Sequence, residues 1–161
     1  MSSKNKAGLA RSLLAPFSGR AIPLEQVPDD VFSRKLLGDG AAIIPADGRL
    51  CAPADGVVSM IAETLHAYVF TSGDGLEILV HVGLDSAALG GEGFTPRVKQ
   101  GDRVRAGQLV AEIDLKLLER RGVPNVVPIL ICEGAEDVTM NTVTGNVTAG
   151  EDAVILLDRR F

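Results

Sequence analysis

Residues 64–85 read T-L-H-A-Y-V-F-T-S-G-D-G-L-E-I-L-V-H-V-G-L-D. Two apolar runs, rich in β-branched residues, flank the turn signal S-G-D-G at 72–75, a pattern typical of a β-hairpin. A two-residue loop at Gly73-Asp74 places His66 directly opposite His81, and a loop one residue later makes them diagonal neighbours. Because side chains alternate with period two, both registers put the histidines on the same face. The sequence therefore predicts a histidine pair.

The same alternation assigns each residue of the hairpin to a face. One face is apolar and is predicted to lie on the core: Leu65, Ala67, Val69, Leu76, Ile78, Val80 and Val82. The other face is mixed: Thr64, His66, Tyr68, Phe70, Glu77, Leu79, His81 and Gly83. A mixed surface of this kind is typical of contact with a partner. The chain has only 2 histidines, so we favour a functional pair over two buried rings bonded to backbone carbonyls.

Composition limits the class of protein. The chain has 161 residues and a net charge of −5, which fits one domain and argues against a nucleic-acid partner. The longest apolar stretch, Val126–Cys132, is too short to span a membrane. Cys51 and Cys132 belong to no closely spaced pair, so we predict two reduced thiols in a cytoplasmic protein.

Residues 1–15 differ from the rest. Lys4 and Lys6 precede leucines at helical spacing, and Arg11 interrupts the apolar stretch, which disfavours a secretory signal. We predict a flexible or weakly amphipathic tail that makes at most peripheral membrane contact. Residues 16–161 are predicted to form a single domain.

Beyond residue 16 the chain is rich in turn signals and short apolar runs. The runs predict these strands: Ala42–Pro45, Val57–Ile61, Leu65–Thr71, Leu76–Val82, Gln108–Ile113, Val126–Cys132 and Ala153–Leu157. Short helices are predicted at Leu115–Arg121, after Asp114, and at Ser86–Leu89, after Asp85. The expected fold is all-β, an antiparallel β-sandwich or flattened barrel with one or two short helices.

Two apposed imidazoles are suited to nucleophilic relay. One neutral ring attacks an electrophile and holds it covalently, while its neighbour orients it or stabilises charge. A permanent zinc site needs three or four ligands, so His66 and His81 would require Asp85 or an outside residue. Geometry alone does not say which ring is the nucleophile.

Six ordered motifs carry a resemblance to a known family. They are V-P-D-D-V-F at Val27–Phe32, G-D-G-A-A-I at Gly38–Ile43, A-P-A-D-G at Ala52–Gly56, T-L-H-A at Thr64–Ala67, H-V-G-L-D at His81–Asp85 and G-E-G-F at Gly91–Phe94. With them the chain resembles the glucose-family enzyme IIA component of the bacterial phosphoenolpyruvate:sugar phosphotransferase system.

The resemblance implies an antiparallel β-sandwich and a phosphotransferase component with a covalent phosphohistidine intermediate. It implies that His81 is phosphorylated on Nε2 by phospho-HPr and passes the group to a cysteine of the cognate IIB domain. His66 matches the histidine that assists transfer, and Thr64 matches the threonine that orients His66. No cofactor is required, although His66 and His81 are candidates to bind Zn²⁺ transiently with a partner carboxylate. Some family members also regulate other proteins.

The resemblance further implies that Asp29, Phe32 and Asp85 frame the docking surface for partners. Each has a simpler interpretation: Asp29 as a turn residue, Phe32 as a core residue and Asp85 as a helix N-cap.

Two other classes are alternatives. A-P-A-D-G-V-V and V-K-Q-G-D-R-V-R-A-G-Q-L-V-A-E-I resemble strands of biotinyl and lipoyl carriers, but the hairpin tip at 72–75 lacks the lysine that such carriers modify. A β-rich metallopeptidase would need metal ligands beyond the two histidines.

Overall fold

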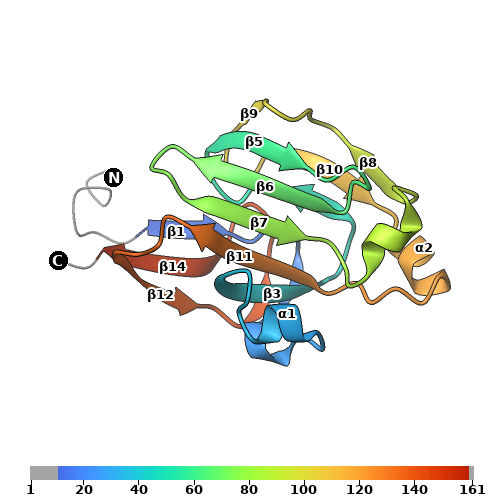
Figure 1. The fold of residues 1–161 in the computed structure, drawn as a ribbon, viewed down its shortest axis with the longest axis horizontal. Coiled ribbons are helices and arrows are strands. Elements are labelled where there is room, and N and C mark those ends of the chain that lie inside the picture. Colours follow the sequence, from blue (N-terminus) through green and yellow to red (C-terminus); the bar gives the residue numbers. More distant parts are fainter. Residues whose placement is uncertain (1–10, 160–161) are drawn as a thin grey trace.

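The computed structural model describes residues 11–159, which form a β-rich domain (Figure 1). The strands are β1 (Arg11–Leu14), β2 (Gly19–Pro23), β3 (Asp39–Pro45), β4 (Arg49–Cys51), β5 (Gly56–Ile61), β6 (Ala67–Ser72), β7 (Glu77–His81), β8 (Phe94–Pro96), β9 (Arg103–Val104), β10 (Leu109–Ile113), β11 (Val127–Glu133), β12 (Val138–Thr142), β13 (Gly145–Val147) and β14 (Ala153–Arg159). Two short α-helices, α1 (Asp30–Ser33) and α2 (Leu115–Arg120), and two 3₁₀ turns, η2 (Leu24–Gln26) and η3 (Ser86–Leu89), complete this part.

The strands form one large sheet and two small ones. The large sheet has 8 strands in the order β13-β2-β3-β11-β7-β6-β5-β9, and the small sheets are β4-β10-β8 and β1-β14-β12. Figure 1 shows β5, β6, β7, β11 and β3 side by side across the molecule, with α1 next to β3. All strand pairs are antiparallel. The predicted all-β antiparallel fold is confirmed.

The large sheet is covered on its inner face and on part of its outer face. Its inner face packs on the small sheets through the main core, which includes Phe17, Ile43, Ile78 and Ile129. Its outer face carries a second, smaller cluster that joins Phe32 of α1 to Leu79 of β7 and Leu130 of β11. Antiparallel strands usually have one solvated face, so this second cluster marks where the segment containing α1 covers the sheet.

The β6–β7 hairpin has a three-residue loop, and the predicted two-residue loop is wrong. The backbone N–H of Ser72 donates to Leu76 O (2.9 Å) and that of Gly75 donates to Ser72 O (3.0 Å). Gly75 has φ 93°, so the loop follows the common pattern of a tight turn closed by a left-handed residue. Glycine adopts this conformation at little cost, which favours the longer loop over the two-residue turn.

The longer loop shifts the register by one residue, so Ala67, not His66, lies opposite His81. A shift of one residue exchanges the two faces of a strand. Tyr68 and Phe70 are therefore buried in the main core, contrary to the prediction. Ala67 and Val69 belong instead to the second cluster. The predicted core face of β7 is confirmed, because Ile78, Val80 and Val82 are fully buried.

The N-terminal segment is structured from Arg11 onward, so the predicted tail boundary at residue 15 is wrong. β1 pairs with β14, and Leu13 and Ala15 are fully buried. Arg11 also forms an ion pair with Asp74 at the tip of the β6–β7 hairpin. Leu13 is buried in a strand that pairs with β14. The helical spacing of the leucines in this segment did not predict this strand. The predicted tail over residues 1–10 lies outside the described residues.

Both predicted helices are present as short elements. α2 begins after Asp114, whose carboxylate accepts from Leu117 N–H at 3.1 Å. Ser86–Leu89 forms the 3₁₀ turn η3. None of the helices in the described residues is long and apolar enough to cross a membrane. Cys51 and Cys132 are both free thiols, as predicted.

Replacing Tyr68 with phenylalanine should stabilise the fold. The Tyr68 hydroxyl is buried and has no hydrogen-bond partner among the described residues, and burial raises the pKa of Tyr68 to about 12. A buried, unsatisfied polar group costs about 1–3 kcal/mol. Tyr68→Phe should therefore raise the free energy of unfolding by about 1–2 kcal/mol in urea denaturation. A loss of similar size would show instead that an internal water satisfies the hydroxyl.

Candidate active site

The two histidine rings are in contact, as predicted from the hairpin. Their centroids lie 4.8 Å apart and the ring planes meet at 81°, an edge-to-face arrangement. His81 ends β7, and His66 immediately precedes β6. The pair does not arise from direct opposition, because Ala67 is the residue opposite His81. The backbone around His66 must therefore depart from regular strand geometry.

The hydrogen bond of His81 determines its tautomer. Nδ1 of His81 lies 2.8 Å from the backbone carbonyl oxygen of Gly83. A carbonyl oxygen can only accept, so Nδ1 carries the proton of the neutral ring and Nε2 keeps its lone pair. Nε2 is thus the nucleophilic atom of His81.

His66 is held by a neighbouring hydroxyl. Thr64 Oγ1 lies 2.7 Å from Nδ1 of His66, which is the contact that the family resemblance implies. A hydroxyl can donate or accept. When Thr64 donates to Nδ1, the neutral ring carries its proton on Nε2, and this N–H can stabilise negative charge near His81.

Burial keeps both rings neutral. Burial, followed by repulsion from His81, lowers the pKa of His66 below its usual value near 6.5. Burial also lowers the pKa of His81, and the Gly83 hydrogen bond, Asp29 and Asp85 offset only part of this effect. Near pH 7 the lone pair of His81 is therefore available for attack.

Phe32 of α1 packs on the ring of His81. Its ring centroid lies 5.0 Å from that of His81 at an interplanar angle of 57°. Phe32 is buried in the second cluster, so the core interpretation holds, and the same ring also shields His81.

Asp29 and Asp85 lie close enough to His81 to raise its pKa. Asp29 is the N-cap of α1, with its carboxylate accepting from Val31 N–H at 2.9 Å. Asp85 occupies the N-cap position of η3 but makes no side-chain cap bond, so the cap interpretation loses its support. Its φ of 57° is unusual for a non-glycine residue, and such strain is often found at functional sites.

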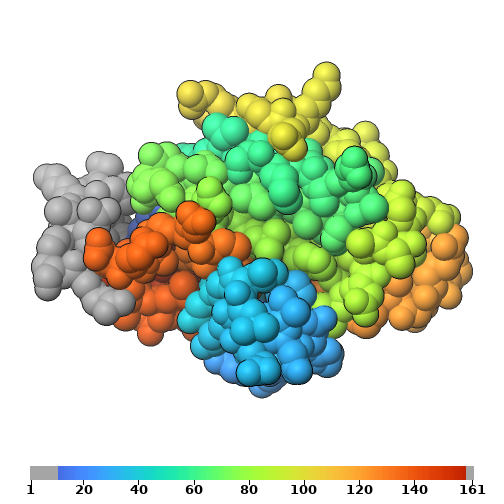
Figure 2. Space-filling model, viewed as in Figure 1, coloured from blue at the N-terminus to red at the C-terminus, as the bar shows by residue number. Residues whose placement is uncertain are grey.

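An exposed apolar surface on the segment that contains α1 was not predicted. Val31, Leu36 and Leu37, on and just after α1, are 41%, 63% and 47% exposed. Figure 2 shows this segment standing out from the face of the molecule in cyan. The sequence signal was the V-F-S-R-K-L-L run at 31–37, whose leucines do not follow the periodicity of a helix or strand.

The carbonyl of Gly83 was also missed, because backbone groups leave no signal in composition. Gly83 has φ 83°, and its N–H donates to Val126 O at 3.0 Å. The buried Ser86 hydroxyl donates to Val82 O. These bonds hold the turn that follows β7 and so aim the carbonyl at the His81 ring.

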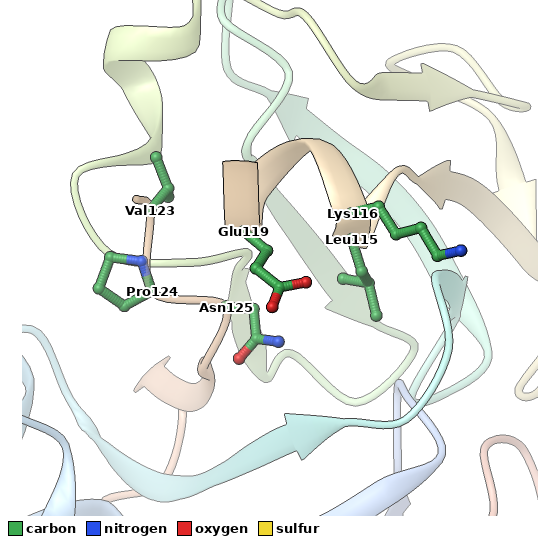
Figure 3. Close-up of a pocket in the computed structure, with 6 residues that line it drawn as sticks. All are labelled: Leu115, Lys116, Glu119, Val123, Pro124 and Asn125. Atoms are coloured by element: carbon green, nitrogen blue, oxygen red, sulfur yellow. The ribbon is translucent and has the colours of Figure 1, made fainter. Parts of the chain in front are cut away.

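The part of the chain that the structure describes offers no second candidate as strong as the histidine pair. No group of three His, Cys, Asp or Glu side chains could hold a metal there. A pocket of about 390 Å³ lies beside α2 and is lined by Leu115, Lys116, Glu119, Val123, Pro124 and Asn125 (Figure 3). It contains no histidine or cysteine, and Lys116 points away from Glu119 and Asn125. The histidine pair therefore remains the candidate active site.

Comparison with known proteins places the chain beside relatives of one family. Two relatives are PTS system glucose-specific EIIA components. The one from Oceanobacillus iheyensis is 40% identical over 146 residues, which cover 89% of this chain and 88% of the relative. The one from Haemophilus influenzae is 40% identical over 157 residues, covering 98% and 95%. The solved structure of glucose permease IIA from Mycoplasma capricolum superposes with a TM-score of 0.85 at 34% identity, over 91% of this chain and 95% of that one.

A longer protein also contains the same unit. The glucose-specific EIICBA component of Staphylococcus saprophyticus is 45% identical over 120 residues, which are 74% of this chain and 18% of that protein. The family profile described as phosphoenolpyruvate-dependent sugar phosphotransferase system, EIIA 1, matches residues 11–137. The chain therefore belongs to the EIIA 1 family of the phosphoenolpyruvate-dependent sugar phosphotransferase system.

Proposed function

We propose that the protein is a phosphocarrier, in which Nε2 of His81 accepts a phosphoryl group from phospho-HPr and passes it to a cysteine of a cognate IIB domain. The observation that carries this proposal is the bond from His81 Nδ1 to Gly83 O at 2.8 Å, which leaves Nε2 as a free nucleophile. The proposed reaction takes place in the cytoplasm.

Each step of the proposed relay is a substitution at phosphorus. The lone pair of His81 Nε2 forms a new N–P bond while the bond from phosphorus to the donor breaks, and the donor keeps that electron pair. In the second step a cysteine thiolate of the acceptor forms an S–P bond, and His81 recovers its lone pair. Neither step needs a metal or a redox partner.

His66 has the geometry to assist both steps. Its ring stands edge-on to His81 with centroids 4.8 Å apart, so an N–H on Nε2 lies near the phosphoryl oxygens. A donor fixed where charge develops lowers the barrier without reorganisation. Thr64 orients this ring through its contact with Nδ1.

The exposed surface around α1 supports docking of both partners. Val31, Leu36 and Leu37 provide apolar area beside Phe32, and the carboxylates of Asp29 and Asp85 are suited to basic groups on a partner. The EIICBA relative carries its A component in one chain with B and C components, which supports a IIB domain as the acceptor. Glucose is the first sugar to test, because the relatives are named glucose-specific.

Reconstitution tests the proposal. Incubation with phosphoenolpyruvate, enzyme I and HPr should place one acid-labile, alkali-stable phosphate on His81, identified by mass spectrometry of the intact chain and its peptides. Addition of a cognate IIB domain should then discharge it. A phosphate found on another residue would refute the assignment.

Transient zinc binding is a secondary proposal. His66 and His81 offer two imidazoles, about half of a tetrahedral zinc shell, and a partner carboxylate would supply a third ligand. Equilibrium dialysis should show zinc retained only when such a partner is bound, and its absence with every partner tested would remove the idea. Regulation of other proteins also stays a prediction from the sequence.

A further inference from the structure

We propose that Leu65 is a positioning residue for the histidine pair, because its left-handed backbone provides the irregularity that turns the His66 ring onto His81. The effect on phosphoryl transfer rests on the proposed phosphocarrier function, whereas the geometric role does not.

Regular strand geometry would point His66 away from His81. Ala67 lies opposite His81 and Tyr68 lies opposite Val80. The residue before Ala67 would share the face of Tyr68, which is the buried core. Val82, whose N–H donates to His66 O at 2.7 Å, is fully buried on that side. His66 nevertheless contacts His81, so the alternation is broken just before β6.

The break coincides with Leu65. Leu65 has φ 65°, and its N–H donates to Ala62 O at 2.8 Å. A tight turn followed by a left-handed residue is the arrangement that forms a bulge in hairpin loops. A bulge places one extra residue in a strand and re-aims the side chain beside it. The β6–β7 register, shifted by one residue, would place the His66 side chain on the core face. The extra residue at Leu65 reverses its direction once more, so that His66 lies on the same face as His81.

The other hairpin of β6 provides an internal comparison. There the N–H of Gly75 donates to Ser72 O, and Gly75 has φ 93°. The two turns have the same bond and the same sign of φ, but one uses glycine and the other leucine. Positive φ is costly for a leucine, so Leu65 is held there by its surroundings.

The leucine side chain lies in apolar surroundings at this position. It packs against the main core, and a Cβ atom added to Gly91 would lie 3.5 Å from Leu65 Cδ1. The same turn carries Thr64, whose hydroxyl contacts His66 at 2.7 Å. Thr64, Leu65 and His66 therefore act as one unit in which the middle residue sets the direction of the ring.

Two substitutions separate the backbone role from apolar packing. Leu65→Asn removes apolar surface but tolerates positive φ, whereas Leu65→Val keeps apolar surface but strongly disfavours that conformation. Because the chain has only 2 histidines, a nuclear Overhauser contact between their ring protons is assigned without ambiguity. We expect Leu65→Asn to keep this contact and Leu65→Val to lose it.

The same variants should separate the two steps of the relay. Leu65→Val should slow transfer from phospho-His81 to the IIB domain by about 100-fold, as expected for a misplaced catalytic group. Acceptance of phosphate by His81 should change far less. Leu65→Asn should keep both rates within about threefold of the wild-type protein, a change small beside that loss.

Gly75→Val is the matched control. It imposes the same conformational strain on the other hairpin, where an added Cβ meets nothing within 4 Å. Its melting temperature should fall, while the contact between the histidine rings and both transfer rates stay unchanged.

The outcomes distinguish the possible explanations. If Leu65→Asn loses the ring contact and Leu65→Val keeps it, apolar packing positions His66 and the proposal is wrong. If both variants keep the contact, Leu65 does not position His66 at all. If Leu65→Val does not fold, Leu65→Asn still decides between backbone and packing. If the wild-type protein accepts no phosphate, the proposed function fails while the ring contact still tests Leu65.

Discussion

Replacing His81 with alanine should abolish phosphorylation of the protein by phospho-HPr. Alanine removes the Nε2 lone pair of His81, which the bond from Nδ1 to Gly83 leaves free. Among the described residues of the site, His66 is the only other side chain with a partly buried, neutral, nucleophilic nitrogen. Loss of a covalent nucleophile costs ~10⁴-fold or more in rate. Radiolabelled phosphoenolpyruvate with enzyme I and HPr measures this directly.

The control for this experiment is Tyr68→Phe, which changes the core side of β6 and should accept phosphate normally. The wild-type rate should also fall as the pH drops below about 6.5, since protonation removes the lone pair. The lowered pKa of His81 places the midpoint of this fall below 6.5, its usual value. Normal labelling of His81→Ala would show that the central assignment is wrong.

Replacing His66 with glutamine should leave acceptance largely intact and impair onward transfer. Glutamine keeps an N–H donor and similar length but cannot exchange a proton as imidazole does. The pair stands edge-to-face at 4.8 Å, and in the proposed relay His66 acts on charge that develops around the phosphoryl group. Loss of such a contribution slows a step by about 100- to 1,000-fold.

Rapid-quench measurement of phosphate passing from pre-phosphorylated protein to a IIB domain isolates the second step. His66→Gln should accumulate as the phosphorylated form, whereas His81→Ala should stay unphosphorylated. Thr64→Val is the matched variant, because it keeps His66 but removes the hydroxyl at 2.7 Å; it should show a smaller defect in the same step. Equal impairment of acceptance and transfer in His66→Gln would contradict the assigned role.

The site was predictable to a useful extent because its signals are local. Turn residues and apolar runs located the hairpin, and its two predicted strands contained both histidines. Asp114 and the residues after it contained the full cap and helix pattern, which α2 confirms. Local rules succeed where a residue's conformation depends on its immediate neighbours.

Two of the elements that were not predicted, β1 and α1, depend on distant partners. β1 pairs with β14 across almost the whole chain, and α1 covers the sheet because Phe32 packs on Leu79 and Leu130. Neither element has a strong local pattern, since α1 contains 4 residues and β1 contains 4. Their apolar side chains gain burial only after the sheet exists, so the sequence around them could not reveal their positions.

The amino-acid sequence by itself determined the all-β class, the hairpin that contains both histidines, and the motifs of the EIIA 1 family. The tertiary structure alone decided the register, which moved Tyr68 and Phe70 into the core, and the left-handed turn at Leu65. Each of these two departures from the expected hairpin reverses the direction of the His66 side chain once. Together they leave His66 on the same face as His81. The physical reason is that side-chain direction in a strand reverses with every residue, so the pair depends on backbone conformations that residue patterns do not specify.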